Sequence, residues 1–90
     1  MRVVQANVLK SPLMNILIED AEKLEYLTSS NRWTKNAAEG RDFGETKAAF
    51  AVAKQEPMGA FNIVAYFAIT KQLINMEHGR GKGIAETDPA

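Results

Sequence analysis

Residues 61–69 read FNIVAYFAI and form the longest apolar-rich run of the chain. If residues 61–76 formed a helix, apolar side chains would lie around its whole circumference, so the helix would need burial on every side. A chain of 90 residues rarely buries a helix in this way. Six of the nine residues are β-branched or aromatic, and alternate apolar side chains from Phe61 onward share one face of a strand. The segment therefore predicts a strand that is covered on both faces.

The residues that follow predict a hairpin partner for this strand. Residues 73–76 again carry apolar side chains, and residues 68–72 form the expected connection. That connection has no Gly, Asn or Asp, which are the usual residues of tight hairpins. A helix over 69–77, capped by Gly79, is therefore the alternative.

The first third of the chain predicts a short strand and a long helix. Residues 2–9 are rich in valine and lack a helix-start signal, which favours a strand. Ser11 and Pro12 then suit the N-cap and the first position of a helix. A helix over 12–28 has one apolar stripe, made by Leu13, Leu17, Ala21 and Leu24.

Two more helical segments are expected before the apolar run. Residues 32–39 suit two helical turns closed by Gly40. Asp42 and Glu45 have the spacing of a capping box, which predicts an alanine-rich helix over 43–55.

These segments predict a small α+β domain with an N-terminal strand, two or three helices and a C-terminal strand or hairpin. An all-α helical bundle is the alternative. We expect one globular domain over 1–78 and a flexible, glycine-rich tail over 79–90, which has little apolar surface to offset its ordering entropy. Because so small a sheet leaves open edges, we also expect a homodimer that buries the apolar strand.

Composition limits the classes of function. The chain has 11 basic and 11 acidic residues, which argues against a nucleic-acid-binding protein. It has no cysteine and one histidine, so we expect neither a metal site nor a cofactor. No run approaches the ~20 apolar residues of a membrane-spanning helix, and the first residues do not suit a secretion signal. We therefore expect a cytoplasmic protein that does not enter a membrane.

The segment 79–83, Gly-Arg-Gly-Lys-Gly, is the best candidate for binding an anionic ligand. Its glycines expose amide groups, and Arg80 and Lys82 add positive charge beside His78, the only side chain that ordinarily titrates near neutral pH. The segment lacks the Ser or Thr of a phosphate-binding loop and the third glycine of a dinucleotide fingerprint. A small anion-binding protein or enzyme using these residues is the alternative function.

The first hypothesis is a non-catalytic interaction or regulatory protein that binds itself or another protein. Trp and Arg are enriched at binding hot spots, and the region 58–67 is a second candidate for the contact. The candidate contact residues are Trp33, Arg32, Phe61, Tyr66 and Phe67. No residue is assigned a catalytic role.

Overall fold

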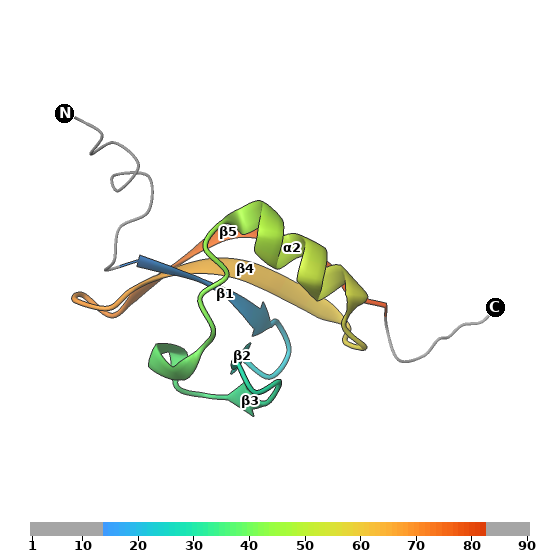
Figure 1. Ribbon diagram of the computed structural model, residues 1–90, viewed down its shortest axis with the longest axis horizontal. Coiled ribbons are helices and arrows are strands. Elements are labelled where there is room, and N and C mark those ends of the chain that lie inside the picture. Colours follow the sequence, from blue (N-terminus) through green and yellow to red (C-terminus); the bar gives the residue numbers. More distant parts are fainter. Residues whose placement is uncertain (1–13, 83–90) are drawn as a thin grey trace.

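The computed structural model describes residues 14–82 and shows one antiparallel sheet with a helix lying across one face (Figure 1). The strand order is β3-β2-β1-β4-β5. The strands are β1 (Met14–Asp20), β2 (Glu25–Leu27), β3 (Trp33–Thr34), β4 (Ala60–Phe67) and β5 (Gln72–Arg80). The helical elements are a single 3₁₀ turn, η1 (Ala37–Glu39), and one α-helix, α2 (Thr46–Gln55). The described domain is thus mostly β with one α-helix, and it is not a helical bundle.

Strand β4 matches the strand predicted at 61–69 and lies inside the sheet. It pairs with β1 over the whole of that strand, from Met14 opposite Phe67 to Asp20 opposite Phe61. Its residues from Ile63 to Tyr66 are all buried, which confirms cover on both faces.

The helix predicted over 12–28 is wrong within the described residues, because 14–27 form two strands and a turn. Strand β4 needs a hydrogen-bonded neighbour on each edge, and β1 supplies one of them. The chain reverses over the four residues 21–24, where Leu24 adopts a φ of 56°. Residues 32–39 likewise form β3 and η1 rather than two α-helical turns.

Helix α2 confirms a helix within 43–55, although its start differs from the prediction. Asp42 does not cap it, because its Oδ1 accepts hydrogen bonds from the N–H groups of Ile16 (2.9 Å) and Gly44 (3.0 Å). Glu45 is the N-cap residue and makes no side-chain capping bond. Asp42 therefore ties the connection to β1, and the predicted capping box is absent.

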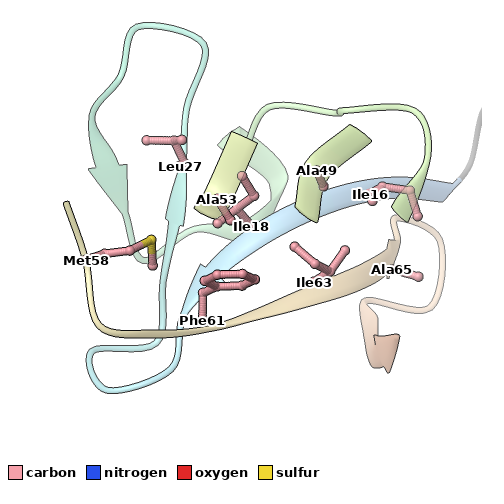
Figure 2. Close-up of a cluster of buried hydrophobic side chains, with 9 residues drawn as sticks. All are labelled: Ile16, Ile18, Leu27, Ala49, Ala53, Met58, Phe61, Ile63 and Ala65. Atoms are coloured by element: carbon pink, nitrogen blue, oxygen red, sulfur yellow. The ribbon is translucent and has the colours of Figure 1, made fainter. Parts of the chain in front are cut away.

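The core lies between α2 and the sheet (Figure 2). Ala49 and Ala53 bring the helix close to the strands because their side chains are small. The buried cluster consists of Ile16, Ile18, Leu27, Ala49, Ala53, Met58, Phe61, Ile63 and Ala65. A second buried cluster lies on the other face, where Ala37 of η1 packs against it. Its members are Leu17, Tyr26, Val64 and Tyr66.

Strands β4 and β5 form the predicted hairpin, so the alternative helix over 69–77 is wrong. In place of a glycine, Lys71 takes the left-handed conformation in the turn, with a φ of 61°. Strand β5 continues to Arg80, past the domain boundary predicted at 78, so the tail expected from residue 79 does not begin there. The predicted strand at 2–9, the start of the predicted helix and the rest of the tail (83–90) lie outside the described residues.

Candidate interaction surface

Strand β5 forms one edge of the sheet and is exposed along most of its nine residues. Leu73, Ile74 and Met76 keep 42%, 47% and 49% of their surface exposed. In the described part of the chain, no strand pairs with the outer side of β5. A long edge with exposed apolar side chains is the type of sheet edge that accepts another strand.

The other outer strands leave much less backbone open. Strand β3, at the opposite edge, has only two residues. Strand β2 pairs with β3 on one side and, on the other, with only the last two residues of β1. Further along β1, residues 41–43 cover the strand, and the Phe43 N–H donates to the Ile16 carbonyl (2.9 Å). The long unpaired edge is therefore that of β5.

The backbone direction along the end of β5 follows from two hydrogen bonds. Gly81 N–H donates to the Gly59 carbonyl (3.0 Å), while the Ala60 carbonyl accepts from Ala21 N–H (3.1 Å) and so points away from β5. Ala60 pairs with Arg80 in the register of the two strands. Because backbone groups alternate in direction along a strand, Arg80 and His78 direct their N–H and C=O groups outward. These groups are positioned to bond a further strand.

A β-bulge determines which side chains of β5 lie on which face. Ile63 pairs with Glu77, whereas the next residue, Val64, pairs with Asn75, so Met76 is an extra residue. The face on which α2 lies carries the side chains of residues 72, 74, 77 and 79, and the opposite face carries those of 73, 75, 78 and 80.

An open-sided pocket of about 310 Å³ lies between α2 and β5. Its lining comes from Thr46, Lys47 and Phe50 of the helix and Glu77 of the strand. The ring of Phe50 is held edge-on against Phe61, with 5.4 Å between the ring centroids. The pocket therefore combines a fixed aromatic wall with one positive and one negative side chain.

The three residues predicted to bind an anionic ligand form a row, but not a loop. His78, Arg80 and Lys82 are exposed and occupy alternate positions. The N–H groups of Gly81 and Lys82 already donate to the Gly59 and Glu56 carbonyls, each at 3.0 Å. A phosphate-binding loop needs free amides, so the anion loop expected at 79–83 does not form at these two residues. What remains is a basic row along the strand.

Most of the predicted contact residues lie in or against the core. Phe61 and Tyr66 are buried, so in this fold they are not available to a partner, and this part of the sequence prediction requires correction. Phe67 and Trp33 are partly buried and pack against the core cluster on the α2 side. Arg32 is exposed and lies at the far side of the sheet from β5. The structure does not gather these five residues into one surface.

One buried carboxylate lies away from β5 and has partners for both oxygens. Glu19 accepts hydrogen bonds from the Tyr26 hydroxyl (2.9 Å) and from Asn62 Nδ2 (3.0 Å). Burial, followed by the hydrogen bond and the negative charge of Glu19, raises the pKa of Tyr26 to about 12. This arrangement ties β1, β2 and β4 together, and nothing about it indicates a reaction.

Sequence reasoning missed the pocket and the exposed apolar row. The run 73–76 predicts a strand, but only the strand order shows that this strand has an open edge. Phe50 and Lys47 line the pocket only because α2 lies beside β5. No signal in the sequence by itself indicates that placement.

Comparison with protein-family models, with curated proteins and with solved structures finds no match for this chain. Within residues 14–82, the helices are too short and too polar to cross a bilayer.

Proposed function

We propose that this protein is a small, non-catalytic interaction domain that binds an extended polypeptide segment along β5. The observation that carries the proposal is the nine-residue edge with exposed apolar side chains and outward backbone groups at His78 and Arg80. An added strand would satisfy these backbone groups, and side-chain pockets beside the edge would select its sequence.

The remaining features of β5 favour a selective interaction over indiscriminate strand pairing. The bulge at Met76 bends the edge, and Glu77 adds a charge beside it. Bulges and charged residues are the devices by which natural edge strands limit aggregation. A partner segment must therefore match both the bend and the charges. Self-association, in which β5 pairs with β5 of a second copy, is one form of this function.

Photo-crosslinking in cells of the native host tests the proposal, because it captures whichever segment lies on β5. A photoreactive amino acid replaces Asn75, at the edge of β5, in the full chain. The control places it at Ser29, an exposed position in the turn between β2 and β3, at the far side of the sheet from β5. We expect adducts from position 75 and few from position 29, with a dimer-sized adduct if the partner is a second copy.

A pair of substitutions at one residue identifies strand pairing as the cause. His78→Pro removes an outward N–H that makes no bond within the sheet, and proline is tolerated at such edge positions. His78→Ala removes the same side chain but keeps the N–H. We expect the adduct to be lost with His78→Pro and kept with His78→Ala, while circular dichroism shows both variants folded. An adduct that survives His78→Pro, or no adduct above the Ser29 control, would disprove the proposed function.

A further inference from the structure

We infer that the segment which pairs with β5 is acidic and places one aromatic or long aliphatic side chain in the pocket between α2 and β5. This inference rests on the proposed function, since it names the chemistry of the partner at the same edge.

The charge along β5 favours an acidic partner. Between residues 71 and 82 the chain carries three cationic side chains, Lys71, Arg80 and Lys82, and one carboxylate, that of Glu77. All four side chains are exposed. Residues opposite each other on paired strands interact directly, and opposite charges there are stabilising. Carboxylates opposite His78 and Arg80 would therefore meet the basic row on the face away from α2.

A second copy of the chain fits this edge less well. In an antiparallel pair, residues opposite each other must lie on the same face. With the extra residue at Met76, two twofold registers about the centre of β5 satisfy this rule, one with Ile74 opposite Glu77 and one with Ile74 opposite Gly79. At both ends, the first register sets Lys71, in the turn before β5, opposite Arg80, and the second sets it opposite Lys82. Like charges in that position are destabilising. The charge pattern thus favours an acidic segment of another protein.

The pocket defines the central side chain of the partner. A residue opposite Glu77 shares the face on which α2 lies, so its side chain points toward the pocket lined by Thr46, Lys47 and Phe50. Phe50 offers an aromatic wall, and aromatic pairs favour the edge-to-face or offset contacts that such a wall allows. An aromatic or long aliphatic residue at this position would fill the pocket and cover the ring.

Three synthetic peptides of nine residues test the inference. The probe is a fluorescein-labelled peptide, Thr-Glu-Val-Glu-Phe-Thr-Val-Thr-Val, which in the antiparallel register sets its Phe opposite Glu77 and its Glu residues opposite His78 and Arg80. One control replaces both Glu by Lys, and the other replaces the Phe by Ala. Fluorescence anisotropy with the full chain gives each dissociation constant. We expect each control to bind at least about fivefold more weakly than the probe.

Charge reversal on the protein checks the register. With Arg80→Glu, we expect the Lys peptide to bind more tightly than the Glu probe, which reverses the preference. Arg32→Glu makes the same change of charge at the far side of the sheet and should leave the preference as it was. No reversal with Arg80→Glu would overturn the inference.

Other outcomes separate the inference from the proposed function. If the Glu and Lys peptides bind equally and His78→Pro abolishes both, strand pairing holds and the acidic partner is wrong. Equal binding of the Phe and Ala peptides overturns the role of the pocket in the same way. The inference is also overturned if no peptide binds, or if sedimentation shows a dimer through β5 that the Glu probe does not disrupt. In either case, the crosslinking experiment alone decides the proposed function.

Discussion

Gly79 allows β5 to lie directly under two aromatic rings. A Cβ atom at this position would lie 2.9 Å from Phe50 Cε1 and 2.9 Å from Phe61 Cζ, closer than side-chain atoms approach each other. Both rings are held by the core, so they have little room to move. We expect Gly79→Ala to lower the free energy of unfolding by about 1–3 kcal/mol, measured by urea denaturation. Gly59→Ala is the control, because the nearest atom to its new Cβ is 3.7 Å away; equal losses in the two variants would contradict this account.

Tyr26 makes the stability of the fold sensitive to alkaline pH. Its pKa is about 12 in the folded protein, against an ordinary value of 10.0. Because the folded state holds the phenolic proton more tightly, this contribution to stability is complete below pH 10 and is lost as the pH rises to 12. We expect the free energy of unfolding to fall over that range, and to fall less in Tyr26→Phe, as measured by urea denaturation between pH 9 and 12. The control is Tyr66→Phe, which leaves the hydrogen bond between Tyr26 and Glu19 in place, so its free energy of unfolding should fall with pH as in the wild type. A Tyr26→Phe profile identical to that of the wild type would refute the assignment to Tyr26.

At the scale of the elements, two of the hairpins, β1–β2 and β4–β5, use the same four-residue turn. Leu24 N–H donates to the Asp20 carbonyl (2.8 Å), and Lys71 N–H donates to the Phe67 carbonyl (2.7 Å). Both donors have positive φ, a conformation that costs a residue with a Cβ roughly 1–2 kcal/mol. Glycine relieves this backbone cost, but it also loses more conformational entropy on folding, which offsets part of the gain. We therefore expect Leu24→Gly to raise the free energy of unfolding by about 0.5 kcal/mol. Glu22→Gly, in the same turn at a residue without positive φ, should lower it, and thermal unfolding of the two variants gives the comparison.

These turns also explain how far the sequence predicts the elements. The sequence predicts strand β4 and helix α2 because each carries a strong local pattern. Strand β4 is an apolar run that needs cover on both faces, and α2 is rich in alanine. Residues 21–24, Ala-Glu-Lys-Leu, are good helix formers, so the reversal between β1 and β2 is hidden inside an apparent helical stripe. The pairing of β1 with β4 involves residues more than 40 positions apart, which no local pattern records.

The candidate site follows the same rule. The positions of His78, Arg80 and Lys82 are conspicuous in the sequence because a histidine and two cations alternate with glycines. Their arrangement as a row on an edge strand depends on the strand order, and the pocket beside them depends on where α2 lies. Residue type alone does not distinguish a core aromatic residue from an exposed one, which is why the sequence places Phe61 and Tyr66 among the contact residues.

At the scale of the whole molecule, one sheet joins two buried clusters into a single structure. The larger cluster lies under α2, and the smaller one lies on the opposite face, against Ala37. Neighbouring residues of β1 and β4 alternate between the two clusters, so neither cluster can open without disturbing the same strands. Strands β2 and β3 extend the sheet from β1, and Trp33 of β3 packs against the larger cluster.

This arrangement predicts one cooperative unfolding transition. Trp33 is the only tryptophan, so its fluorescence reports on the β3 edge, while far-UV circular dichroism reports on the whole fold. We expect the two signals to give the same midpoint in urea for the wild type, for Ile18→Val in the larger cluster and for Val64→Ala in the smaller one. The free energy of unfolding should fall by about 1 kcal/mol in Ile18→Val and by roughly 2 kcal/mol in Val64→Ala, since these remove one and two buried carbon atoms from opposite faces. A fluorescence midpoint that precedes the circular dichroism midpoint would show instead that β2 and β3 unfold before the rest of the sheet, and that the clusters are not coupled through it.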